Sequence, residues 1–195
     1  EHGIIRLDGK PLKIKSPRDA IRQGICLLTE DRKTHGLVLS QTARENFGLP
    51  NLSQFASLGF IRQREESREF LRYVDQIQIK IADPEQITGT LSGGNQQKVV
   101  LAKWLQRNAE VIIFDEPTRG IDVGAKYEIY QLINQLAEQG KAILMISSEL
   151  PEILGVSDRV LVMNEGHITG EITDIANATQ EDVMNLATKR EAVAA

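Results

Sequence analysis

Residues 111–118 read Val-Ile-Ile-Phe-Asp-Glu-Pro-Thr, an apolar stretch that ends in two consecutive carboxylates. The apolar run predicts a buried strand from Val111 to Phe114. Parallel sheets place ligands outside the carboxyl ends of their strands, so we expect Asp115 and Glu116 to face one. Phosphoryl transfer needs a carboxylate that holds Mg²⁺ and a group that orients or deprotonates the attacking water. Asp115 suits the first role and Glu116 the second; a strand followed by a helix-capping acid is the alternative.

Short apolar strands alternate with helices after Glu110. This alternation is typical of a parallel sheet covered by helices. The expected elements are a helix at Gly124–Glu138, a strand at Ala142–Ile146, a helix at Glu149–Leu154, a hairpin at Arg159–Met163 and His167–Ile172, and a last helix at Thr179–Ala187.

The first hundred residues have a different pattern. Thr42, followed three residues later by Glu45, predicts a helix start, and the pattern is then helical to about Arg107, with two segments of 3.6-residue periodicity. Before it we expect a hairpin (Ile4–Leu7 and Leu12–Ile14, turning at Asp8-Gly9), a helix that starts at Ser16-Pro17 and ends at Gly24, and a buried strand at Ile25–Thr29.

A second chemical signal is Leu-Ser-Gly-Gly-Asn-Gln-Gln at residues 91–97, directly before the apolar-periodic helix Val99–Leu105. Two glycines at a helix N-terminus let backbone N–H groups approach an anion, and the helix dipole and the Ser92 hydroxyl add attraction for phosphate. The alternative is a loop in which Ser92 only caps the helix and the glycines only turn the chain.

Together these segments resemble the ATP-binding cassette (ABC) family. Residues 91–97 look like its signature motif, residues 111–117 like its Walker B motif, and residues 120–122 like the loop that follows. The resemblance covers essentially the whole chain. It implies an α/β fold with a P-loop NTPase-like core and a parallel sheet, a small antiparallel β lobe and a helical lobe. The implied parts are residues 1–40 with the Q-loop region, residues 41–107 with the signature motif, and residues 108–195 with Walker B and the switch loop.

The resemblance also implies cofactors and site residues. ATP and Mg²⁺ are the expected cofactors, with Asp115 as the metal ligand and Glu116 and Ser148 as the catalytic residues. The residues expected to bind the cofactor are Ser92, Gly93, Gly94, Asn95, Gln96, Glu30 and Asp122.

Residues 30–37, 93–98 and 118–125 look most like the second cassette of two-cassette ATPases that drive ribose, galactose, xylose or arabinose importers. The implied function is the ATP-binding and ATP-hydrolysing subunit of a bacterial monosaccharide importer. Its partners would be a second cassette, membrane-spanning permease subunits and, indirectly, a periplasmic sugar-binding protein. The expected location is peripheral, on the cytoplasmic face of the inner membrane.

This sequence departs from the family pattern in three places. No Gly-x-x-x-x-Gly-Lys-Ser/Thr occurs in it, so we expect a chain cut upstream of its opening hairpin that alone neither hydrolyses ATP nor folds stably. Glu30 stands where most cassettes carry a Gln. Ser148 stands where they carry the switch His, and a serine hydroxyl cannot hold a γ-phosphate through the charge-assisted hydrogen bond that an imidazolium makes. Either these residues work differently, or the chain acts mainly in trans, through Ser92-Gly93-Gly94 and Asp122.

Composition limits the remaining options. Lys and Arg total 23 against 27 Asp and Glu, a formal net charge of -4, which disfavours nucleic acid as a partner. Two rival functions stay open: a non-catalytic, truncated or degenerate cassette, and a non-transport ABC ATPase that acts on ribosomes or DNA. The single cysteine, Cys26, lies in an apolar run and is expected to be buried rather than reactive.

Several other side chains have structural interpretations. His2, His35 and His167 lack metal-ligand spacing, and Trp104 is expected on the apolar face of its helix. Four further apolar residues would supply either the docking surface for a membrane subunit or core packing: Phe47, Leu49, Phe55 and Phe60.

Overall fold

The computed structural model describes residues 3–188. The chain divides into two compact units, Glu1–Ile146 and Ser147–Ala195. Within the described part, no helix is both long enough and apolar enough to cross a membrane.

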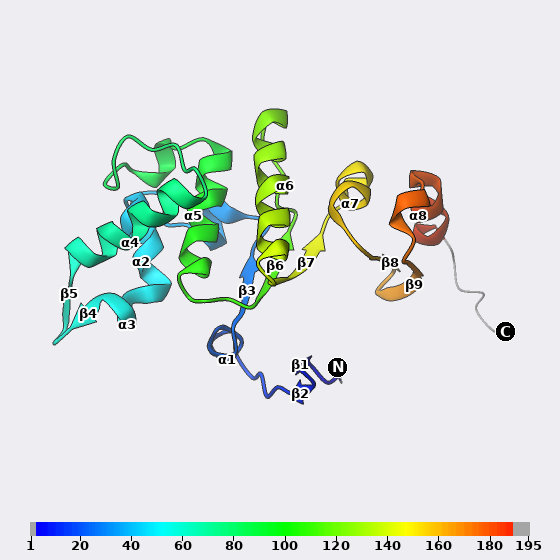
Figure 1. Cartoon of the computed structure of the whole chain (residues 1–195), viewed down its shortest axis with the longest axis horizontal. Coiled ribbons are helices and arrows are strands. Elements are labelled where there is room, and N and C mark those ends of the chain that lie inside the picture. Colours follow the sequence, from blue (N-terminus) through cyan, green and yellow to red (C-terminus); the bar gives the residue numbers. More distant parts are fainter. Residues whose placement is uncertain (1–2, 189–195) are drawn as a thin grey trace. The chain divides into compact units, whose positions relative to one another are not determined.

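A three-stranded parallel sheet forms the centre of the first unit (Figure 1). Its strands are β3 (Ile25–Leu28), β6 (Val111–Asp115) and β7 (Ala142–Ile146), hydrogen-bonded in that order. The register pairs Leu28 with Phe114 and Asp115 with Ile146, so all three strands end at one edge. The predicted parallel sheet is therefore confirmed.

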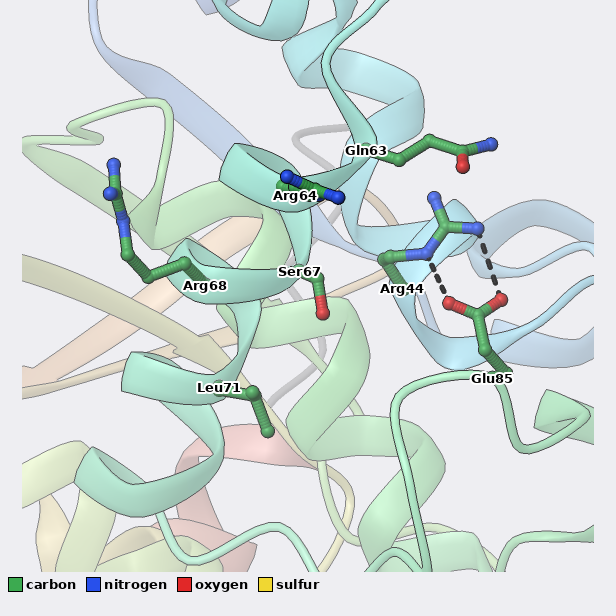
Figure 2. Close-up of a pocket in the computed structure, with 7 residues that line it drawn as sticks. All are labelled: Arg44, Gln63, Arg64, Ser67, Arg68, Leu71 and Glu85. Carbon is green, nitrogen blue, oxygen red and sulfur yellow. Dashed lines mark hydrogen bonds and ion pairs between the residues drawn. The ribbon is translucent and has the colours of Figure 1, made fainter.

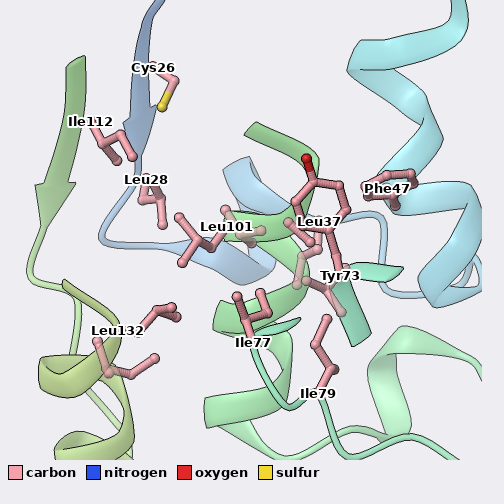
Figure 3. Packing of buried hydrophobic residues seen from close by; sticks show 14 of the residues in the cluster. Cys26, Leu28, Leu37, Phe47, Tyr73, Ile77, Ile79, Leu101, Ile112 and Leu132 are labelled. Atoms are coloured by element: carbon pink, nitrogen blue, oxygen red, sulfur yellow. The ribbon is translucent and has the colours of Figure 1, made fainter. Parts of the chain in front are cut away.

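One face of this sheet packs on the core. Cys26, Leu28 and Ile112 point from the strands toward Leu101 of α5 (Gly93–Leu105) and Leu132 of α6 (Val123–Glu138), as Figure 3 shows. Burial raises the pKa of the Cys26 thiol to about 12, which keeps it protonated and unreactive. Trp104 packs, partly buried, against the same cluster, as expected.

A helical lobe lies between β3 and β6 in the sequence. It contains α2 (Ala43–Gly48), α3 (Leu52–Phe55), α4 (Gln63–Gln76), the short β4–β5 hairpin (Ala56–Ser57 and Phe60–Ile61), a π-helix η1 (Arg32–Gly36), and the 3₁₀ turns η2 (Leu49–Asn51) and η3 (Thr88–Thr90). The Thr42–Glu45 capping box that starts α2 is present as predicted.

Aromatic packing holds the lobe together. Phe47 is fully buried, and its ring centroid lies 5.9 Å from that of Phe55, 5.3 Å from that of Phe70 and 5.6 Å from that of Tyr73. Core packing is thus the role of Phe47 and Phe55. Leu49 and Phe60 are exposed, at 40% and 79%.

The chain starts with a small antiparallel hairpin, β1 (Arg6–Leu7) and β2 (Lys10–Pro11), which turns at Asp8-Gly9 as predicted. The first strand is shorter than expected, and the prediction of the second at Leu12–Ile14 was wrong, because the tight turn at Asp8-Gly9 pairs Leu7 with Lys10 directly. Helix α1 (Pro17–Arg22) follows, with the Ser16 hydroxyl accepting the hydrogen bond that caps it.

The second unit contains α7 (Leu150–Val156), the hairpin β8 (Val160–Asn164) and β9 (His167–Ile172), a 3₁₀ turn η4 (Ile175–Asn177), and α8 (Gln180–Ala187). Val160, Val162 and Val183 form its small core. His35 and His167 are exposed, and His2 lies outside the described residues.

Candidate functional site

The carboxyl edge of the central sheet carries the predicted acidic pair. Asp115 ends β6, and the next residue, Glu116, has a φ of +47°, in the left-handed region that bulky residues rarely adopt. The Glu116 N–H donates to the Ile146 carbonyl at 2.9 Å, and the Glu116 carbonyl accepts from the Arg119 N–H at 3.1 Å. The strained turn leaves both carboxylates half-buried at the strand end.

Glu30 reaches the same edge from β3. It lies two residues beyond Leu28, as Glu116 lies two beyond Phe114, and Leu28 pairs with Phe114. The Glu30 carboxylate forms an ion pair with the Arg119 guanidinium. A cavity of about 330 Å³ is lined here by Glu30, Asp31, Arg32, Lys33, Arg119 and Gly120.

The signature loop, residues 91–95, starts α5. The Ser92 hydroxyl caps the helix and accepts from the Asn95 side-chain amide at 2.9 Å, while the Asn95 side-chain oxygen accepts from the Lys80 N–H at 2.7 Å. Gln96 points inward, 4% exposed, and its amide donates to the carbonyls of Thr88 and Leu91, both at 3.2 Å. Gln96 thus supports the loop from behind, and Ser92 remains exposed.

Both glycines of this loop lie against other segments. A Cβ at Gly93 would be 2.7 Å from Arg32 Nη2 and 3.2 Å from the Gly120 carbonyl oxygen, and one at Gly94 would be 3.0 Å from Ala125 Cβ. Side chains there would push the signature loop away from residues 118–125. The glycines are therefore required for this close packing.

Asp122 begins α6. Its carboxylate accepts from the Ala125 N–H at 3.0 Å and is exposed. Because Gly94 packs on Ala125, the loop that carries Asp122 lies beside the signature loop.

The predicted residues of the first unit thus form two neighbouring groups: the edge carboxylates Glu30, Asp115 and Glu116, and the loops that carry Ser92–Gln96 and Asp122. Ser148 belongs to the second unit, where Ser147 donates to Glu152 and accepts from the Glu149 N–H at 3.0 Å. Its catalytic role stays a prediction.

The sequence patterns assigned no role to Arg32 and Arg119. Arg32 Nη1 donates to the Arg119 carbonyl at 3.0 Å, across 87 positions of sequence. One sequence feature could have indicated the ion pair between Glu30 and Arg119: an arginine follows the Walker B-like stretch, and Glu30 replaces an uncharged residue.

The donor set fits a magnesium nucleotide. Among residues 3–188 no cluster of three or more His, Cys, Asp or Glu side chains could hold a metal by itself. Mg²⁺ usually binds through one or two carboxylates together with phosphate oxygens and waters. Asp115 at the strand end is such a carboxylate, so this edge suits a metal that arrives with a phosphate ligand.

A second cavity of about 430 Å³ lies in the helical lobe (Figure 2). Arg44 forms one wall, where its guanidinium pairs with Glu85 through Nε–Oε1 at 2.5 Å and Nη2–Oε2 at 3.0 Å. The other wall is α4, which contributes Gln63, Arg64, Ser67, Arg68 and Leu71.

Comparison with known proteins places this geometry in context. The ABC transporter family model matches residues 1–119. A protein of Rhizobium etli, named for ribose, galactose or methyl galactoside import, is 58% identical over 186 residues, 95% of this chain and 35% of its own length. The ribose import ATP-binding protein of Oceanobacillus iheyensis is 54% identical over 188 residues, 96% of this chain and 38% of its own length. The chain thus spans little more than a third of these relatives.

Solved structures share the fold. A nucleotide-free ATP-binding cassette from an ABC transporter superposes with a TM-score of 0.75 at 22% identity, covering 97% of this chain and 74% of that one. A dimeric cassette bound to ADP and phosphate gives a TM-score of 0.71 at 21% identity, covering 88% and 73%. These neighbours confirm the predicted α/β cassette fold.

Proposed function

Because the chain belongs to the ABC transporter family, whose members bind nucleotide, we propose that it works in the ATP-binding subunit of a bacterial monosaccharide importer. The observation that carries this proposal is the placement of the signature loop beside the loop of Asp122, next to the edge that holds Asp115 and Glu116. The relatives named for ribose or galactose import support sugar as the substrate.

The residues divide the chemistry between them. Asp115 would hold Mg²⁺, which, when bound, neutralises charge on the phosphates. Glu116 would orient or deprotonate the attacking water at the adjacent position. Ser92 and the N–H groups at the start of α5 would hold phosphate oxygens through hydrogen bonds and the helix dipole.

The signature loop would act on nucleotide held by a second cassette. Ser92 and Asp122 are exposed on neighbouring loops, which suits contact across a dimer. Ser148 offers only a neutral hydroxyl where an imidazolium would give a charge-assisted bond. The chain would therefore contribute more to its partner's site than to its own.

The helical lobe is the proposed docking surface for a membrane-spanning subunit, which would hold the protein peripherally at the cytoplasmic face. Leu49, Leu52 and Phe60 are exposed there, at 40%, 41% and 79%. The proposal requires these side chains to form one apolar patch, because contiguous exposed apolar patches mark sites of protein contact.

Sugar uptake by the assembled importer tests this function. Gly94→Val should abolish uptake, because the side chain would strike Ala125 and displace the signature loop, whereas Ser148→Ala should be nearly silent. Gly155→Val is the matched control, because a Cβ at Gly155 meets nothing within 4 Å. Equal loss from Gly94→Val and Ser148→Ala would contradict the asymmetry.

A non-catalytic cassette is the second candidate, favoured by the absence of a Gly-x-x-x-x-Gly-Lys-Ser/Thr motif from these residues. Glu116→Gln separates the two candidates. If this cassette hydrolyses ATP, the variant should lower ATPase activity while ATP binding persists; an unchanged rate would favour the non-catalytic function.

A further inference from the structure

A buried arginine joins three segments beside the candidate site. Arg32 is 8% exposed at the start of η1. Its Nη1 donates to the Arg119 carbonyl at 3.0 Å, and its Nη2 donates to the Gly120 carbonyl at 3.5 Å. The same Nη2 fills the space that a side chain at Gly93 would need. Arg32 therefore lies between the loop of residues 118–122 and the signature loop.

Backbone carbonyls, rather than a paired carboxylate, accept hydrogen bonds from the Arg32 guanidinium. Among the described residues no carboxylate forms an ion pair with its guanidinium, and its Nε is buried without a partner. Burial lowers the pKa of Arg32, which the nearby charge of Asp31 partly offsets. A buried cation is costly unless hydrogen bonds compensate it. The two carbonyls of loop 118–122 supply that compensation, which ties the loop to Arg32.

A second link converges on the same loop. The Arg119 side chain pairs with Glu30, while the Arg119 carbonyl accepts from Arg32. Both side chains of the ion pair are substantially exposed, at 67% and 42%, so it contributes more to specificity than to stability. The Glu30 carboxylate is thus engaged with a protein cation.

We propose that Arg32 and the Glu30–Arg119 ion pair form a clamp that holds loop 118–122 against the signature loop. Arg32 and Arg119 are then positioning residues, and Glu30 acts by setting the loop rather than by holding metal. The role of this clamp in ATP hydrolysis rests on the proposed function, but the clamp itself is a property of the fold.

Hydrogen–deuterium exchange at the amides of residues 118–122 tests the clamp directly in the purified protein. Arg119→Glu places two carboxylates together and should speed exchange about two- to fivefold, the range expected for an exposed ion pair, whereas combining it with Glu30→Arg should restore the parent rate. Arg32→Lys keeps the charge but cannot reach both carbonyls, so it should also speed exchange. Lys33→Ala, an exposed neighbour, is the control and should change nothing.

Two results would overturn the proposal: Arg32→Lys leaving exchange unchanged, or the charge swap failing to restore it. Circular dichroism identifies any variant that unfolds, and Arg119→Gln then provides a milder test of the same pair.

Steady-state ATPase in the assembled importer gives the functional readout. A misplaced loop should lower kcat about ten- to a hundredfold with little change in KM, and the swap should recover it. If the parent importer shows no ATPase while the exchange pattern holds, the proposed function fails and the clamp stands. If kcat falls in the single variants without recovery in the swap, Glu30 has a direct role and the clamp is wrong.

Discussion

Glu66 is a carboxylate enclosed within the helical lobe, 2% exposed. Burial raises its pKa, and the ion pair with Arg44 only partly offsets that effect. A side chain at Gly48 would overlap the Glu66 carboxylate, so the space around it is full. The pair is thus a structural contact that orders α2 against α4.

Replacing Glu66 with Ala should cost about 3 kcal/mol in the free energy of unfolding, because it removes one carboxylate from the buried Arg44. Arg44 keeps Glu85, which limits the loss to the lower end of the usual range. Urea unfolding at neutral pH measures it. Glu69→Ala is the control, because Glu69 pairs on the surface with Arg72 at 3.3 Å and should cost less than about 0.5 kcal/mol. Similar losses in both variants would show that Glu66 is not enclosed.

At the scale of elements, Lys103 ties α5 to the end of η1. It is 7% exposed, and its Nζ donates to the Gly36 carbonyl. Desolvation lowers the pKa of Lys103 to about 8, against about 10.4 for an unperturbed lysine. Between these two values the unfolded chain binds more protons than the folded one, so this group makes stability rise with pH.

Comparing the parent protein with Lys103→Met separates the effect of Lys103 on the free energy of unfolding from the effects of other titrating groups. The parent protein should gain about 3 kcal/mol relative to the variant between roughly pH 8 and pH 10.5, with little relative change below pH 8. Denaturant unfolding at several pH values measures the difference. Parallel stability curves for the two proteins would mean that Lys103 is hydrated in the folded state.

Most element types were predictable from local chemistry, but the β4–β5 hairpin lies in a stretch that was predicted to be helical. Thr42 with Glu45, Ser16 before Pro17, and alternating apolar runs act within a few residues, so their caps and strands could be located from sequence. Phe47 and Leu49 have the same apolar character, yet only Phe47 faces the aromatic cluster. The π-helix at residues 32–36 carried no local signal.

The candidate site was predictable only in part, because sequence patterns reveal local features but not contacts between distant segments. Asp115, Glu116 and Ser92 stand beside strand or helix ends that the sequence pattern reveals. Arg32 donates to the carbonyl of Arg119, 87 positions away in the sequence. Every residue has a backbone carbonyl, so the residue type at position 119 does not indicate this contact. Contacts of that kind depend on the assembled fold.

In the first unit, one face of the central sheet leaves apolar side chains exposed. Leu27 of β3 and Leu144 and Ile146 of β7 lie on the sheet face opposite the core, exposed at 43%, 52% and 47%. Parallel sheets are normally covered on both faces. An apolar face of this kind calls for a further packing partner, which agrees with a chain that spans little more than a third of its relatives.

The 195-residue chain alone should therefore bind a hydrophobic dye such as ANS through this face. The double variant Leu27→Thr/Leu144→Thr should lower dye fluorescence by about half and change the free energy of unfolding by less than about 0.5 kcal/mol, since exposed positions tolerate substitution. Leu58→Thr is the control: Leu58 is 97% exposed at the turn of the β4–β5 hairpin rather than on the sheet, so its loss should lower dye fluorescence much less than the double variant does. A destabilisation of several kcal/mol in the double variant would instead mean that the two leucines are already buried in the isolated chain, because only buried apolar area contributes on that scale.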